Sequence, residues 1–183
     1  MAAFVAPMAA NAQAFGVKLG GNIRDYKTTE PEPGQHIVQP PLPHARMELY
    51  FAMAADDGTV CAVTGVGNTI RSDLSGVETR KEFSYWRDAL VRRYGQPSDD
   101  FDWLDKDAST EEKNDFRKAL KSEKRVLDTF WIKADGANLP SSVTNIRLQM
   151  TAGDDGSYVA IRYEGADYDT CQASYFRKRD TGL

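Results

Sequence analysis

Hydrophobic residues recur at every second position over residues 47–54, which is typical of a strand with one buried face. Asp56-Asp57-Gly58 then predicts a turn, and residues 59–66 predict the returning strand of a hairpin. Three more strand patterns follow nearer the C-terminus, at residues 126–133, 143–151 and 157–164. Gly-containing turns separate them, so they predict an antiparallel meander with one face exposed to solvent.

Between these two regions the hydrophobic period changes to three or four residues. The apolar stripe of this predicted helix consists of Phe83, Trp86, Leu90 and Tyr94. Gly95 and Pro97 predict its end. A second helix is expected to begin at Ser109, because residues 109–112 form a capping box. Its apolar face is narrow, so we expect it at the periphery.

Strands that are segregated from helices indicate an α+β fold. We therefore expect one domain over residues 15–183, in which an antiparallel sheet carries one main amphipathic helix and one peripheral helix. The sheet would combine the N-terminal hairpin with the C-terminal three-strand meander. Residues 15–19 predict a short first strand, and the proline-rich residues 26–43 predict an extended, polyproline-like segment along an edge. The basic run at residues 176–179 is expected to be a solvated tail.

Composition limits the classes of function. The 183 residues are 41% hydrophobic and 27% charged, which suits a single globular domain. The 23 basic and 27 acidic side chains give a net charge of −4, so no general positive field would attract nucleic acid or anionic lipid. We therefore expect neither a nucleic-acid partner nor insertion into a membrane.

Residues 1–14 are uncharged and end in the small residues that a signal peptidase recognises, at Ala10-Asn11-Ala12 and at Ala12-Gln13-Ala14. We interpret them as the remnant of an export signal, although the positive region that usually opens one is missing. The alternative is an apolar segment that packs on the domain. The stretch contains Pro7 and is too short to cross a bilayer, which needs about 20 apolar residues.

Two cysteines, Cys61 and Cys171, agree with export, because an even number of cysteines in an oxidising compartment usually indicates a disulfide. Such a bond would join the first hairpin to the C-terminal region. The alternative is two buried free thiols in a cytosolic protein. We expect the protein to be periplasmic or secreted.

Motifs that would indicate an enzyme or a cofactor are absent from the sequence. It contains no phosphate-binding loop, no zinc-protease motif and no nucleophile elbow. Both histidines, His36 and His44, lie in the proline-rich segment, where up to roughly 25–28 Å of extended chain separates them. We therefore expect no cofactor and no metal site. Two carboxyl groups that meet across the fold remain possible as catalytic groups.

One segment differs from the rest of the chain, at residues 99–107. Its five aspartates and one lysine give a local charge of −4, and aromatic side chains lie between them. The spacing matches no EF-type calcium loop. The candidate binding residues of this acidic and aromatic loop are Asp99, Asp100, Phe101, Asp102, Trp103, Asp105 and Asp107. The alternative is that the aromatic residues cover the core while the aspartates face water.

Aromatic anchors among carboxylates are typical of protein recognition, because the rings provide buried area and the carboxylates attract a positive partner. We therefore expect an exported binding protein, inhibitor-like or immunity-like, that contacts a cationic protein partner. An envelope hydrolase with paired carboxylates and a structural or assembly protein of the envelope are the alternatives. The sequence does not determine the oligomeric state.

Overall fold

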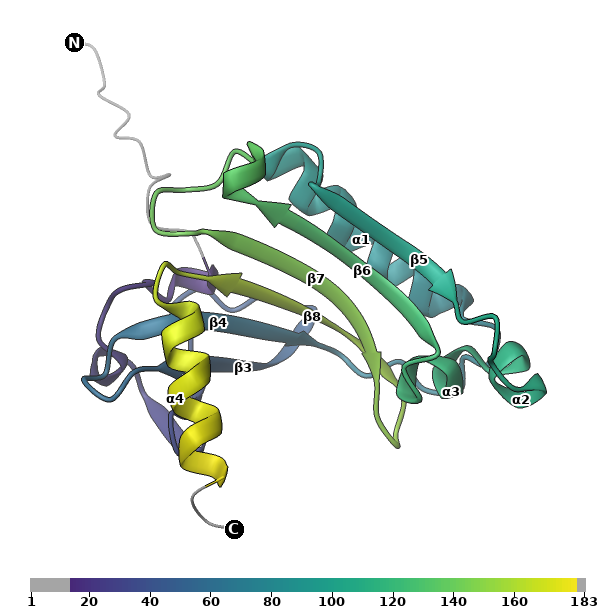
Figure 1. The fold of residues 1–183 in the computed structure, drawn as a ribbon, viewed down its shortest axis with the longest axis horizontal. Helices are drawn as coiled ribbons and strands as arrows, with labels where there is room; N and C mark the ends of the chain where they lie inside the picture. The colour runs from purple at the N-terminus through teal and green to yellow at the C-terminus, as the bar shows by residue number, and fades with distance from the viewer. Residues whose placement is uncertain (1–13, 181–183) are drawn as a thin grey trace.

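A single antiparallel sheet dominates the computed structural model, which describes residues 14–180 (Figure 1). Its eight strands lie in the order β1-β2-β3-β4-β8-β7-β6-β5. The strands are β1 (Thr28–Glu32), β2 (Gln35–Val38), β3 (Met47–Ala54), β4 (Val60–Gly67), β5 (Asp99–Leu104), β6 (Arg125–Ile132), β7 (Asn145–Ala152) and β8 (Ser157–Glu164). The helices are α1 (Val77–Tyr94), α2 (Thr110–Asn114), α3 (Phe116–Lys121) and α4 (Tyr168–Asp180).

The α+β class is confirmed, and the sheet is larger than a hairpin plus a meander. The predicted hairpin is β3–β4 and the predicted meander is β6–β7–β8, and the pairing of β4 with β8 joins them into one sheet. Strands β1, β2 and β5 extend this sheet at its two edges.

Helix α1 packs on one face of the sheet through the apolar stripe that the sequence predicts, with Phe83, Trp86, Leu90 and Tyr94 all buried. Beneath it lie fully buried side chains of the meander, among them Trp131 and Leu148. The Trp131 indole donates a hydrogen bond of 2.9 Å to the carbonyl of Gly95, directly after the helix. Trp131 therefore fixes the C-terminal end of α1 against β6.

The predicted second helix begins with its capping box, as expected. Ser109 Oγ accepts a hydrogen bond from the Glu112 N–H, and the Glu112 carboxylate accepts one from the Ser109 N–H. The helix then ends at Asn114, because Asp115 adopts an extended backbone and caps α3. Two short helices thus replace one, and the narrow apolar face of α3, formed by Phe116, Ala119 and Leu120, is buried.

Residues 15–19 do not form the predicted strand. Phe15 adopts a left-handed backbone with φ of 61°, and its ring packs against Tyr50 and Tyr163 at centroid distances of 4.9 and 5.8 Å. A Cβ atom on Gly65 would lie 2.5 Å from the Phe15 ring, so this glycine in β4 makes room for it. Phe15 therefore packs its ring against the sheet and does not form part of a strand.

The proline-rich segment lies at a sheet edge as predicted, but it is not polyproline-like throughout. Its middle forms the β1–β2 hairpin, which places Pro31 in the outermost strand. An edge strand tolerates proline, because the N–H that proline lacks would face outward.

The C-terminal region forms helix α4 where the sequence analysis predicts a solvated tail. This helix lies across β3 and β4 on the face opposite α1 (Figure 1). A disulfide joins Cys171 in α4 to Cys61 in β4, with the Cα atoms 6.4 Å apart, so the predicted pairing is confirmed. Tyr168 and Cys171 are buried, whereas Ala173, Phe176 and Arg177 are exposed.

The predicted export remnant, residues 1–14, lies outside the described residues except for Ala14. That alanine is 1% exposed and belongs to the core. Among residues 14–180, no helix combines the length and the apolar character that crossing a membrane requires.

Replacement of both cysteines by serine is expected to release α4 from the sheet. The bond closes a separation of 110 residues, and its loss should lower the free energy of unfolding by about 4–5 kcal/mol in the chain-entropy model. Denaturant titration measures this loss, and hydrogen exchange should show that α4 amides lose protection while those of β7 keep it. Unchanged protection in α4 would contradict this role of the disulfide.

Helix α1 is also anchored at its start, by Asp73. Its carboxylate accepts hydrogen bonds from the N–H groups of Val77 (3.1 Å) and Thr79 (2.8 Å). Burial raises the pKa of Asp73, but these N–H groups and the hydroxyls of Thr79 and Ser75 outweigh it, so the pKa is lowered from 3.8.

Asp73→Ala should therefore cost about 1 kcal/mol of stability at pH 7, as the loss of a helix cap does. A group whose folded pKa is depressed stabilises the fold above its unfolded pKa and loses this effect as the pH falls through the folded value. The difference between wild type and variant should accordingly shrink between about pH 5 and pH 2. A difference that stays constant in urea titrations over this range would contradict the assignment.

Candidate functional site

The acidic and aromatic segment was predicted to be a loop, and this prediction is wrong. Most of the segment forms the outermost strand at one edge of the sheet. Asp99–Leu104 forms β5, which among the strands of residues 14–180 pairs only with β6. The first five of its six residues are exposed. Aspartate disfavours strands, but the pairing with β6 and the ion pairs from α1 outweigh this local preference.

Strand alternation separates the candidate residues onto two faces. Asp99, Phe101 and Trp103 lie on the face opposite α1, and Asp100 and Asp102 lie on the α1 face. The carboxylates therefore do not surround the aromatic rings.

Arginine side chains bind both carboxylates on the α1 face. Arg87 donates to Asp100 through Nε (2.8 Å) and Nη2, and Thr129 Oγ1 also donates to Asp100 (2.7 Å). Asp102 accepts hydrogen bonds from Arg80 and from Arg125, the latter at 3.1 Å. These pairs join β5 to α1 and β6.

The remaining carboxylates differ in their surroundings. Asp105 pairs with Lys124 at 3.0 Å, and it also accepts a hydrogen bond from the N–H of Asp107. That N–H and the Lys124 ammonium lower the pKa of Asp105. Among the described residues, Asp99 and Asp107 form no ion pair and are exposed. The local charge of −4 is therefore largely offset by neighbouring cations.

The two aromatic side chains of β5 are open to solvent, with Phe101 40% and Trp103 47% exposed. Val126 and Phe130 of β6 lie on the same face, and the Phe101 and Phe130 rings form an edge-to-face pair with centroids 6.0 Å apart. We call these four residues the aromatic surface. In the described chain no helix covers it, because α1 lies behind this part of the sheet and α4 lies over β3 and β4 (Figure 1). The alternative in which these aromatic residues cover the core is wrong.

A polar belt borders the aromatic surface, formed by Asp128 of β6, Arg147 of β7, and Arg162 and Glu164 of β8. Arg147 binds the Asp128 carboxylate through Nε at 2.9 Å and through Nη2, and Arg162 binds Glu164 at 2.6 Å. Arg147 and Arg162 are directly opposite each other in the ladder, an arrangement that the two carboxylates make tolerable. The Arg147 guanidinium also lies 5.3 Å from the centre of the Phe130 ring.

The sheet divides next to this belt. Pairing between β6 and β7 ends at Asp128 and Gln149, after which β6 continues beside β5, and β7 continues beside β8. The two strands diverge visibly toward α3 (Figure 1). A cleft of about 360 Å³ occupies the fork, and its lining includes Glu123, Val126, Asp128, Arg147 and Thr151.

Asp128 is the buried charged group of this cleft, with 4% of the residue exposed. Burial raises the pKa of its carboxyl group, and the two-pronged ion pair with Arg147 opposes this rise without cancelling it.

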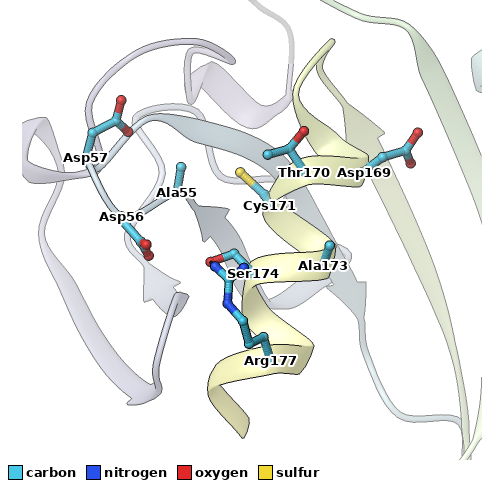
Figure 2. Close-up of a pocket in the computed structure, with 9 residues that line it drawn as sticks. All are labelled: Ala55, Asp56, Asp57, Asp169, Thr170, Cys171, Ala173, Ser174 and Arg177. Carbon is cyan, nitrogen blue, oxygen red and sulfur yellow. The ribbon is translucent and has the colours of Figure 1, made fainter. Parts of the chain in front are cut away.

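A second hollow, of about 660 Å³, lies between the β3–β4 turn and α4 (Figure 2). Asp56 and Arg177 face it from opposite sides, and Asp169 of α4 is also among its lining residues. Asp57 serves the turn itself: its carboxylate accepts the N–H of Thr59 at 2.8 Å, which lowers its pKa. Cys171, which joins α4 to β4 through the disulfide, is among the residues that line this hollow.

Within residues 14–180, no group of three or more histidine, cysteine, aspartate or glutamate side chains is placed to hold a metal ion. Comparison with known proteins finds no family model, no curated protein and no solved structure that matches the chain.

Sequence reasoning identifies the two exposed aromatics of the site but misses what lies beside them. Arg147 is predictable as a residue on the solvent face of the meander, because strand alternation places its side chain on the other face from those of its neighbours Ile146 and Leu148. Its partner Asp128 carries no such signal, since a charged residue inside a strand pattern looks exposed.

Arg147→Met is expected to leave Asp128 buried without its partner, which costs about 3–5 kcal/mol at pH 7 for a buried ion pair. The folded pKa of Asp128 should then rise further. A raised folded pKa stabilises the fold below the unfolded pKa, and this stabilisation is lost as the pH increases through the folded value.

The destabilisation should therefore be small near pH 3 and should grow toward pH 7, and Asp128→Asn should partly rescue the Arg147→Met variant. Thermal melts across this pH range provide the measurement. Equal losses at both ends of the range, with no rescue, would mean that Asp128 is not the affected group.

Proposed function

We propose that this is an exported binding protein, inhibitor-like or immunity-like, that holds a cationic protein partner at β5. The observation that carries this proposal is the pair of large aromatic side chains, Phe101 and Trp103, exposed side by side on a sheet face that no helix of residues 14–180 covers. Such an exposed apolar surface on a folded domain is typical of an interaction site.

The energetics favour these two residues as anchors. Phenylalanine and tryptophan each contribute a large buried area at a small cost in side-chain entropy, which makes aromatic residues common among interface hot spots. Ion pairs from α1 hold β5 in place, so the partner meets a surface that is already ordered.

Charge supports a cationic partner at one position in particular. Asp99 lies on the same face as the aromatic residues and has no ion-pair partner among the described residues, whereas Asp100 and Asp102 are bound by arginines. A lysine or arginine of the partner would pair with Asp99 at the rim of the surface. The net charge of −4 adds weak attraction at longer range.

The disulfide supports export to the periplasm or the medium, because such bonds persist in oxidising compartments. Cleavage after Ala12 would keep Ala14 in the mature chain, in agreement with the burial of Ala14 in the core.

The envelope hydrolase is the second candidate, and the cleft at the fork is the observation that favours it. Asp128, with its raised pKa, and Glu123 both line this cleft. The ion pair with Arg147 occupies the Asp128 carboxylate, however, so we favour binding.

Replacement of both Phe101 and Trp103 by alanine should weaken binding to the partner by more than 1 kcal/mol, which is a loss of more than about fivefold in affinity. The wild-type protein is used to capture partners from the periplasmic or secreted fraction, mass spectrometry identifies them, and calorimetry compares the variants.

Phe176→Ala is the matched control, because Phe176 is 41% exposed but lies on α4. Its affinity should equal that of the wild type. Equal affinity of the double variant, with an unchanged melting temperature, would exclude β5 as the contact surface.

A further inference from the structure

The outer edge of β5 carries a row of backbone groups whose direction follows from the ladder. The N–H of Asp105 donates to the carbonyl of Lys124 at 2.6 Å, and these two residues continue the β5–β6 register. Hydrogen-bonded and non-hydrogen-bonded pairs alternate in antiparallel ladders. Trp103, Phe101 and Asp99 therefore bond to β6.

The alternate residues Asp100, Asp102 and Leu104 consequently direct their N–H and C=O groups away from β6. No strand among residues 14–180 pairs with this side of β5. The close side-chain contact between Asp100 and Thr129, at 2.7 Å, agrees with this assignment, because non-hydrogen-bonded pairs bring side chains closer together.

A groove borders the same edge on the α1 side. It has a volume of about 430 Å³, and its lining includes Phe83 and Leu127 as well as the charged residues Arg87 and Asp100. A strand added to β5 would place alternate side chains in this groove and the others on the aromatic surface. Side chains on both faces of the added strand would thus contact this protein.

From this arrangement we infer that the partner binds by strand addition, as an extended segment that pairs with the outer edge of β5. This inference rests on the proposed binding function and specifies its partner. On the aromatic face the segment would pass Trp103, Phe101 and Asp99 in turn. Its side chains on that face are therefore two apolar residues and then a lysine or arginine, at alternate positions.

Charge on the aromatic face indicates the chemistry of the partner. Arginines bind Asp100 and Asp102, so these two carboxylates are already paired. Asp99 lies on the aromatic face and forms no ion pair among the described residues. The edge therefore favours a segment of another protein that carries positive charge opposite Asp99, and self-association of the chain through β5 would overturn this assignment.

The test compares two substitutions at one position. Asp102→Ala and Asp102→Pro both remove the carboxylate and its ion pairs with Arg80 and Arg125, but only proline removes the outward N–H, and neither removes a backbone hydrogen bond to β6. Random nine-residue peptides displayed on phage are selected on the full-length protein, and the enriched peptides are synthesised. Their affinity should be at least tenfold lower for Asp102→Pro than for Asp102→Ala.

Two further arms separate the possible failures. Peptides that bind both Asp102 variants equally but lose affinity for the Phe101→Ala, Trp103→Ala double variant would overturn strand addition and leave the proposed function standing. Absence of enriched peptides, or enriched peptides indifferent to both changes, would overturn strand addition as well.

Charge is tested with Asp99→Lys, which should change the preferred peptide residue at the position facing it from basic to acidic. Asp107→Lys is the matched control, since Asp107 also has no ion pair among the described residues but lies beyond β5. An unchanged preference in Asp99→Lys would overturn the basic character of the segment. Should Asp102→Pro not fold, N-methylation of the peptide gives the same answer. Alternate residues of a paired peptide direct their N–H groups toward β5, so methylation of that set should abolish binding and methylation of the other set should not.

Discussion

The pairing of β5 with β6 is the constraint on which the proposed site depends. An unpaired chain could direct its aspartates and aromatic residues in any direction, but a strand must alternate them. This alternation places Phe101 and Trp103 together on the open face and sends Asp100 and Asp102 to the arginines of α1 and β6. The same ladder determines which backbone groups remain unbonded at the edge.

The two halves of the sheet are protected in different ways. On the side of β3 and β4, helix α4 covers the face opposite α1, held there by the disulfide. On the side of β5 to β7, no helix of the described residues covers that face, and ion pairs of Arg147 with Asp128 and of Arg162 with Glu164 lie on it. The exposed aromatic surface is small and is bordered by this polar belt. Its limited apolar area reduces non-specific association with other proteins.

Much of the fold was predictable from periodicity. The stripe from Phe83 to Tyr94 specifies α1, and the capping box at Ser109 specifies the start of α2, because both depend on interactions between residues near in sequence. The segments that sequence analysis assigned wrongly all depend on distant partners. Phe15 needs the space above Gly65, and α4 has little apolar stripe of its own and relies on Cys61. The strand at β5 likewise exists because Arg80 and Arg87 neutralise its aspartates from another element.

Residue-resolved amide exchange of the protein alone tests the central claim most directly. If β5 is an edge strand in the register described, the amides of Phe101 and Trp103 are protected, and those of Asp100, Asp102 and Leu104 exchange rapidly. Saturation with a bound segment should then slow this second set selectively. Uniform exchange along residues 99–104, or protection of the second set in the free protein, would contradict the account.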